Sequence, residues 1–172
     1  MAGGVNSVGA GLDIRLATAA DLEAVAAIYN HYVIHSTCTF ATDPEPPAYW
    51  ENWLRTHTGK NPAIVAVRGG EVIGWGTLSG WNNRCAYRFT AENSVYVRDG
   101  CRGGGIGREI LAELIRLARA AGLRSLVAQI ADHQAASEAL HERAGYRRVG
   151  VLEGVGFKFD RWIDVVIWQL QL

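Results

Sequence analysis

The sequence has little of several features that would place it in a protein class at once. Its three cysteines, Cys38, Cys85 and Cys101, are an odd number without the spacing of a disulfide framework. The 17 basic and 17 acidic residues cancel, so no net charge attracts nucleic acid or an anionic membrane. No apolar run reaches the length of a membrane span. These absences predict a soluble, reduced, cytoplasmic protein without nucleic-acid or membrane partners.

The N-terminal stretch is also poor in targeting signals. Residues 1–11, "MAGGVNSVGAG", have neither the basic start nor the apolar run of a signal peptide. We expect this stretch to be a flexible tail. The remaining residues, 12–172, are enough to bury a real core and predict a single domain.

Apolar periodicity alternates between the strand and helix patterns along the chain. A capping-box variant, Thr18 with Asp21, marks the first helix start. The periodicity predicts strands at 12–18, 63–67, 71–80, 125–130 and 162–170, with another ending near 97. It predicts helices at 22–29, 44–58, 106–121 and 134–145. This interleaving indicates an α/β or α+β fold built on one mixed sheet.

Glycine, in contrast, is abundant, and five of the 20 glycines lie between Gly100 and Gly107. They stand between a predicted strand and a strongly amphipathic helix, where backbone N–H groups and the helix dipole favour an anion. A nucleotide-hydrolase phosphate loop requires Lys-Ser or Lys-Thr after its last glycine, but Ile106 follows Gly105. A dinucleotide fingerprint would require glycine at Arg108. A tight turn that only packs the helix on the sheet is the remaining alternative.

The segment "SVYVRDGCRGGGIG" resembles the acetyl-coenzyme A motif of the GNAT superfamily of N-acetyltransferases. Further stretches, "IRLATAADLEAVAAIYNHYV", "FTAENSVYV", "LHERAGYRRVG" and "GFKFDRWIDVVIWQL", resemble the phosphinothricin and methionine sulfone acetyltransferases. The similarity runs from about Ile14 to the C-terminus. It implies a GNAT fold, with one mixed, mostly antiparallel sheet of about seven strands and about four helices. It also implies a homodimer.

The resemblance implies coenzyme contacts but no metal. The backbone of Val95, Tyr96 and Val97 would pair with the pantetheine arm like another strand. The N–H groups of a second set would cradle the diphosphate: Arg102, Gly103, Gly104, Gly105, Ile106 and Gly107. Gln134 and Ser137 of "QAAS" would also contact the coenzyme, although the family usually has asparagine where Gln134 stands.

Acetyl transfer to an amine requires a base, because the attacking amine must lose a proton. Glu92 is out of place in a strand by β-propensity, and by resemblance it occupies the family's general-base position. The alternative is a solvated edge glutamate. His141 is the candidate acid or relay for the leaving thiolate, since the phosphinothricin-type relatives have histidine there and imidazole titrates near neutral pH. Tyr146 is the alternative acid, although a tyrosine at a strand start is more often a core residue.

An amino-acid acceptor needs its carboxylate held, and arginine can grip a carboxylate with two parallel bonds. Arg84 aligns with an arginine of the phosphinothricin enzymes, and Arg88 follows it. We expect further acceptor contacts from Phe40, Asn82, Tyr87 and Ser94, with Trp162 as another possible pocket wall.

Two other chemistries are weaker. His31, His35 and Cys38 suggest a metal site, but no fourth ligand stands out. Cys101 lies in the glycine loop, where no base could activate it as an acyl-carrying nucleophile. We therefore expect direct acetyl transfer from acetyl-CoA, in a ternary complex, to the α-amino group of a small amino-acid-like acceptor. A protein N-terminal acetyltransferase and a non-catalytic acyl-CoA-binding module remain open alternatives.

Overall fold

Seven strands form one mixed sheet in the computed structural model, which describes residues 11–172. The strand order is β1-β2-β3-β4-β5-β7-β6, and only β4 and β5 run parallel. This arrangement confirms the expected GNAT-type sheet. The strands are β1 (Leu12–Leu16), β2 (Ala63–Arg68), β3 (Glu71–Gly80), β4 (Thr90–Val97), β5 (Ser125–Ala131), β6 (Arg147–Lys158) and β7 (Arg161–Gln171). The predicted flexible tail, apart from Gly11, lies outside the described residues.

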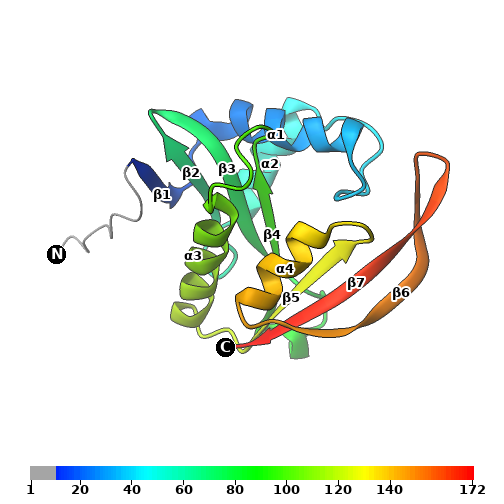
Figure 1. Cartoon of the computed structure of the whole chain (residues 1–172). Coiled ribbons are helices and arrows are strands. Elements are labelled where there is room, and N and C mark those ends of the chain that lie inside the picture. Colours follow the sequence, from blue (N-terminus) through cyan, green and yellow to red (C-terminus); the bar gives the residue numbers. More distant parts are fainter. Residues whose placement is uncertain (1–10) are drawn as a thin grey trace.

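Four α-helices cover the two faces of the sheet (Figure 1). They are α1 (Leu22–His35), α2 (Pro47–Thr56), α3 (Ile106–Ala120) and α4 (Ala135–Arg143). One buried apolar cluster lies under α3, where Ile110 and Leu114 are fully buried as the predicted stripe requires. A second cluster, rich in aromatic rings, joins α1 and α2 to the opposite face.

The parallel strands β4 and β5 separate after three residue pairs. The last pair is Glu92 with Val127. Beyond it β4 pairs only with β3, and β5 pairs only with β7. The edge of β4 from Asn93 to Val97 is therefore open on the side facing β5, in the interior of the sheet.

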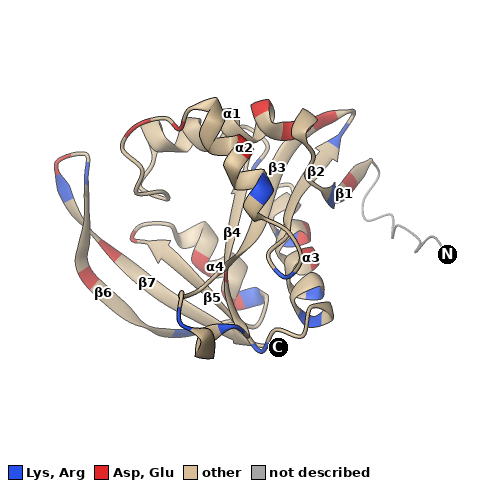
Figure 2. Ribbon diagram, turned by 180° about the vertical axis from the view of Figure 1, so that it is seen from behind, with Lys and Arg blue, Asp and Glu red and all other residues tan. Residues whose placement is uncertain are grey.

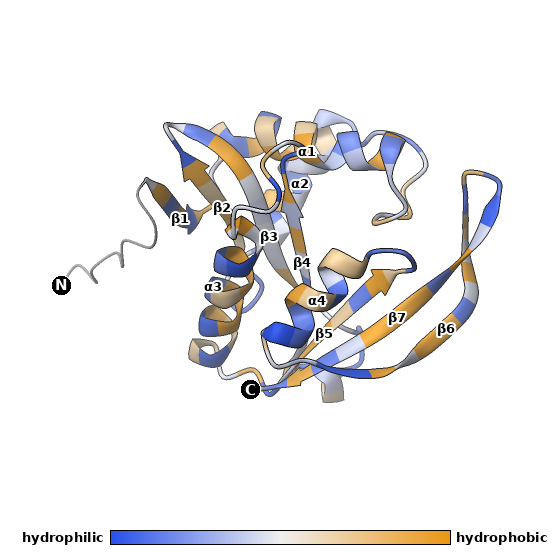
Figure 3. Cartoon of the chain, in the orientation of Figure 1, coloured by the Kyte–Doolittle hydropathy of each residue, from blue (hydrophilic) through white to orange (hydrophobic). Residues whose placement is uncertain are grey.

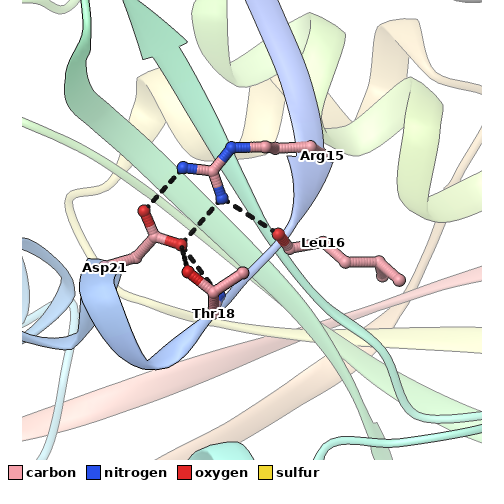
Figure 4. Close-up of polar contacts among 4 residues, drawn as sticks. All are labelled: Arg15, Leu16, Thr18 and Asp21. Atoms are coloured by element: carbon pink, nitrogen blue, oxygen red, sulfur yellow. Dashed lines mark hydrogen bonds and ion pairs between the residues drawn. The ribbon is translucent and has the colours of Figure 1, made fainter.

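The turn between β1 and α1 is held by a buried carboxylate. Two nitrogen atoms of Arg15 donate to the two oxygens of Asp21, each at 2.7 Å, and the N–H and hydroxyl of Thr18 donate to Asp21 Oδ2 at 2.8 Å (Figure 4). These hydrogen bonds, that from Arg15 most of all, lower the pKa of Asp21 to about 2. The Thr18–Asp21 pairing expected from the sequence is thus present at the helix start.

Strand β6 is absent from our periodicity-based list of strands. Its residues do not alternate clearly, and its pairing with β7 is interrupted by irregularities between Arg148 and Gly150 and between Leu152 and Gly156. The β6–β7 hairpin extends beyond the other strands (Figure 1), and apolar residues recur along both of its strands (Figure 3).

Charged residues of both signs are spread over the helices and strands (Figure 2). Within residues 11–172, no helix is long and apolar enough to cross a membrane.

Candidate active site

A groove of about 1080 Å³ follows the open edge of β4. Its walls come from the β4 segment Glu92–Val97, the glycine loop, the start of α3, the end of β5, and α4. The groove therefore joins the predicted coenzyme loop to both predicted catalytic residues, Glu92 and His141. A cavity of this size exceeds the usual range for small-molecule pockets and suits an extended ligand.

Three glycines of the loop are required by the shape of the turn. Gly100, Gly103 and Gly105 have φ angles of +81°, +84° and +80°, a left-handed conformation that favours glycine. At Gly107 φ is not positive, and an added Cβ would lie 3.5–3.9 Å from the Leu140, Val97 and Val95 side chains, which is ordinary van der Waals contact. Neither backbone conformation nor close packing therefore requires a glycine at Gly107.

The turn ends in an open helix N-terminus. Gly105 is the N-cap of α3, and the first helical hydrogen bond runs from Glu109 N to the Gly105 carbonyl at 3.1 Å. The preceding N–H groups of the first turn have no intrahelical partner. All residues of the predicted cradle except Gly104 line the groove. This geometry fits an anion such as a diphosphate.

Arginine side chains add positive charge along the groove. Arg102 pairs with Asp99 and lies over the ring of Tyr32. Arg108, Arg119 and Arg143 also line the groove. These three arginines were not predicted, because the sequence pattern of a surface arginine on a helix is the same whether or not the residue borders a ligand site.

The strand residues divide between the two faces of the sheet. Val95 and Val97 pack against the α3 cluster, whereas Tyr96 packs against the α1–α2 cluster. Glu92 and Ser94 share the face of Tyr96 because side chains alternate along a strand. The hydroxyl of Tyr32 donates to the Val97 carbonyl oxygen.

Glu92 lies where β4 and β5 part, at one wall of the groove. Burial raises the pKa of its carboxyl group, and a hydrogen bond donated by Gln129 Nε2 at 3.1 Å partly opposes this. A carboxylate with a raised pKa is a better proton acceptor. Gln129 was not predicted, although its exposed amide interrupts the buried run "SLVAQIA" of β5.

His141 is only 4% exposed. It therefore does not lie on a solvent-exposed face of α4, although the polar residues near it in the sequence would suggest one. Its Nδ1 lies 2.8 Å from the Ser137 carbonyl, which can only accept. Its Nε2 lies 2.9 Å from the amide nitrogen of Asn93, which can only donate. The ring is therefore neutral with the proton on Nδ1, and burial lowers its pKa. Tyr146 is buried, donates to Asn93 Oδ1 at 2.8 Å, and does not line the groove.

The segment before α2 closes one side of the groove. Lys158 Nζ donates to the carbonyls of Ser36 and Thr39, each at 2.8 Å. The ring of Phe40 lies against Gly156 so closely that any Cβ there would collide with it. Phe40 lines the groove, as expected for an acceptor contact.

Of the remaining predicted site residues, some lie in the groove and some do not. Gln134, Ser137 and Ser94 line it, and Gln134 Nε2 donates to the Thr37 hydroxyl at 3.4 Å. A second group lies on the exposed loop between β3 and β4 and does not line the groove, and its role as an acceptor contact stays a prediction. Its members are Asn82, Arg84, Tyr87 and Arg88.

The structure also shows where the residues considered for covalent catalysis and for metal binding lie. Cys101 is half-buried and lines the coenzyme end of the groove. The rings of His31 and His35 lie 4.8 Å apart on α1, and burial raises the pKa of the Cys38 thiol. Among residues 11–172, no three His, Cys, Asp or Glu side chains gather as a metal site would require.

Comparison with known proteins identifies the family. The chain is 41% identical over 161 residues to an L-methionine sulfoximine/L-methionine sulfone acetyltransferase of Pseudomonas aeruginosa, covering 92% of this chain and 94% of that protein. A phosphinothricin acetyltransferase from Sinorhizobium meliloti, solved with acetyl-CoA, superposes with a TM-score of 0.91 at 36% identity, covering 94% of this chain and 89% of that one.

A further crystal structure, a ribosomal-protein-alanine N-acetyltransferase from Brucella melitensis, matches with a TM-score of 0.90 at 39% identity, covering 92% of this chain and 99% of that one. The family model for the acetyltransferase (GNAT) domain matches residues 14–167. The fold, the groove and these similarities agree, and the chain belongs to the GNAT family of N-acetyltransferases.

Proposed function

We propose that this protein transfers an acetyl group from acetyl-CoA to the α-amino group of a small amino-acid-like acceptor. The observation that supports this most directly is the groove itself. It has an open helix N-terminus with a left-handed glycine turn at one end and the half-buried carboxylate of Glu92 at the strand separation. The helix N-terminus can bind the diphosphate of the thioester donor, and the Glu92 carboxylate can take the proton of the attacking amine.

The reaction follows from this arrangement. The amine nitrogen attacks the thioester carbonyl carbon, forming the C–N bond, and the C–S bond breaks. Glu92 takes the proton that the amine loses, directly or through a water molecule. The open edge of β4 offers backbone N–H groups to the carbonyl oxygen as it gains negative charge. The departing thiolate takes up a proton.

We propose that His141 relays a proton to the departing thiolate, because His141 lines the groove and Tyr146 does not. In the resting protein the Nε2 lone pair accepts from Asn93 and the Nδ1 proton is engaged by Ser137. His141 therefore starts as a neutral group without a proton on Nε2. To relay a proton to the thiolate it must first take one up at Nε2 from water and then release it, and the Asn93 amide must turn away for this to happen. This makes Asn93 a positioning residue for His141.

The acceptors of the relatives define the panel to test. L-Methionine sulfone, L-methionine sulfoximine and L-phosphinothricin are named for such proteins. Acylation of a protein terminus is the second candidate, favoured by the similarity to a ribosomal-protein-alanine N-acetyltransferase.

A coenzyme-thiol release assay with acetyl-CoA, followed by mass spectrometry of the product, separates the candidates. We expect N-acetylated free amino acids. Activity on alanine-terminated peptides alone would support the protein acetyltransferase instead. Tight acetyl-CoA binding without turnover on any acceptor would indicate a non-catalytic module.

We further propose a homodimer and a cytoplasmic location, with residues 12–172 as one acetyltransferase domain. The dimer is supported by large apolar side chains exposed along the β6–β7 hairpin, and Trp162 is 68% exposed. Exposed apolar patches of this kind commonly mark interfaces. Sedimentation equilibrium of the wild type and of Trp162→Asp tests the dimer, and a monomer in both would contradict it.

The proposed cytoplasmic location is supported by the three cysteines, which are all free, because thiols stay reduced in that compartment.

A further inference from the structure

Gln129 is the one exposed residue of β5, a strand whose other residues are all buried. It lies two residues beyond Val127, which pairs with Glu92 of β4. Because side chains alternate along a strand, Gln129 points to the same face of the sheet as Val127 and Glu92. Gln129 also lines the groove. The exposed amide of this buried strand therefore lies on the side of the candidate base.

The Gln129 side chain crosses the gap between the two parallel strands. Backbone pairing of β4 with β5 ends at Glu92 and Val127, and Gln129 itself pairs with Ile167 of β7. Beyond that point Gln129 Nε2 donates to Glu92 Oε2 at 3.1 Å. This side-chain hydrogen bond therefore connects the two strands where the groove opens and their backbones no longer pair.

The direction of this hydrogen bond distinguishes the two oxygens of Glu92. An ionised carboxylate only accepts, so the amide nitrogen of Gln129 must face it and the amide oxygen must point away. No other group within residues 11–172 hydrogen-bonds to the Glu92 side chain. The protein therefore holds Oε2 and leaves Oε1 accessible to a ligand in the groove.

The neighbours of Glu92 within the sheet are uncharged. On β3, Ser79 pairs with Glu92, and the Ser79 hydroxyl lies 3.1 Å from His57 Nε2. Burial lowers the pKa of His57 and raises the pKa of Tyr96, which shares the face of Glu92, so both side chains are neutral near pH 7. Among the described residues, no cation forms an ion pair with Glu92. The hydrogen bond from Gln129 is therefore the contact that opposes the effect of burial on this carboxylate.

The other titratable groups of the groove lie on different elements. On α4, His141 contacts Asn93, which points to the face of β4 opposite Glu92. Burial raises the pKa of Tyr32 on α1 and of Cys38 before α2. The remaining groups are arginines, which stay protonated at every pH of interest: Arg102, Arg108, Arg119 and Arg143. Gln129 contacts none of these groups, so a substitution of Gln129 acts on Glu92.

We propose that Gln129 is a positioning residue for the candidate base: its amide N–H holds one oxygen of the Glu92 carboxylate and leaves the other oxygen free to take the proton of the acceptor's amino group. The proposal rests on the proposed acetyltransferase function. A hydrogen bond donated to a carboxylate favours the ionised form, the form that can accept a proton. The hydrogen bond becomes stronger when coenzyme and acceptor displace water from the groove.

The dependence of kcat/KM on pH tests this role. At saturating acetyl-CoA, kcat/KM for the best acceptor should fall at low pH as Glu92 becomes protonated, whereas the titration of the acceptor's own amine is the same in every variant. Gln129→Leu removes the donor and should move this acid limb to higher pH. At the pH where wild type keeps half of its plateau value, Gln129→Leu should keep about a tenth of its own plateau.

Charged substitutions at Gln129 predict shifts of opposite sign. Gln129→Lys places a cation beside Glu92 and should move the acid limb to lower pH than in wild type. Gln129→Glu places a second carboxylate there and should move the limb to higher pH. A role of Gln129 in folding alone would not reverse sign with the charge. An acid limb that stays in place in all three variants would overturn the proposal.

Gln171 provides a matched control. It is exposed on β7, pairs with Ser125 of β5 and does not line the groove. The same three substitutions at Gln171 change the net charge equally and should leave the acid limb where it is in wild type. Equal shifts at Gln171 and Gln129 would show an effect of net charge and would overturn the proposal.

Two further measurements separate this inference from the proposed function. Calorimetric titration should give an acetyl-CoA affinity within about twofold of wild type in every Gln129 variant, because the glycine loop is untouched. If wild type acetylates no acceptor, the proposed function itself fails. If wild type is active and Glu92→Gln is not, but the acid limb ignores Gln129, this inference alone fails.

Discussion

The amide nitrogen of Asn93 on β4 lies 2.9 Å from Nε2 of His141 on α4, and the Oδ1 of the same amide accepts from Tyr146. One buried asparagine therefore satisfies two aromatic side chains from different elements. It also holds the imidazole as the tautomer with its proton on Nδ1.

Replacing Asn93 tests this network. Asn93→Ala leaves the Nε2 of His141 and the hydroxyl of Tyr146 without partners in a buried site, so the free energy of unfolding should fall by about 2 kcal/mol. Urea denaturation measures the change. Asn83→Ala, on the exposed loop between β3 and β4, serves as control and should stay within about 0.5 kcal/mol of wild type.

His141 makes stability depend on pH. Its pKa in the folded protein is lowered by burial below the ordinary value of 6.5. Below pH 6.5 the unfolded chain therefore binds more protons than the folded one, and stability falls with falling pH. The unfolding free energy should drop between pH 7.5 and 5.5, and the drop should be smaller in His141→Gln. Equal pH dependence in both proteins would show that His141 does not titrate in this way.

The left-handed turn at Gly105 can be tested separately from its neighbours. A β-branched residue at φ +80° is strained, so Gly105→Val should destabilise the loop by about 1–2 kcal/mol and weaken acetyl-CoA binding at least tenfold. Calorimetric titration with acetyl-CoA gives the affinity. Gly80→Val is a matched control, because an added Cβ there meets nothing within 4 Å and no positive φ is required. Its affinity should match that of wild type.

The only two lysines of the chain form a natural pair for comparison. Lys158→Met removes both hydrogen bonds to the segment that carries Phe40, which should lower the unfolding free energy by about 2 kcal/mol. It should also raise KM for the acceptor more than it lowers kcat, because Phe40 loses its fixed position. Lys60→Met, on the exposed turn before β2, should change neither. If Lys158→Met left KM unaltered, Phe40 would not depend on this anchor.

Much of the fold follows from local patterns. The stripe of α3 and the hairpin β2–β3 have clear periods and clear turn residues, and both are present where the sequence predicts them. Strand β6 is less predictable because its residues do not alternate and its register shifts at glycines. Its position is determined by pairing with β7, which no local pattern encodes.

The residues of the site also differ in how well the sequence predicts them. The glycine loop and Glu92 are recognisable because glycine clusters and a carboxylate within a strand are unusual in sequence. The partners Asn93 and Gln129 are not, because an amide that bonds a histidine or a carboxylate looks like any other amide. The small cavity lined by Trp50 and Trp53 of α2 and Trp75 of β3 depends on contacts between residues far apart along the chain. Such contacts become visible only in three dimensions.

In the proposed mechanism Glu92 takes the amine's proton, whereas the glycine loop holds the coenzyme independently of Glu92. The most direct measurement compares wild type with Glu92→Gln in two experiments on the same preparation, calorimetric titration with acetyl-CoA and steady-state turnover of the best acceptor. We predict that the affinity for acetyl-CoA stays within about twofold while kcat falls by about a hundredfold or more. An unchanged kcat in Glu92→Gln would show that Glu92 is not the base.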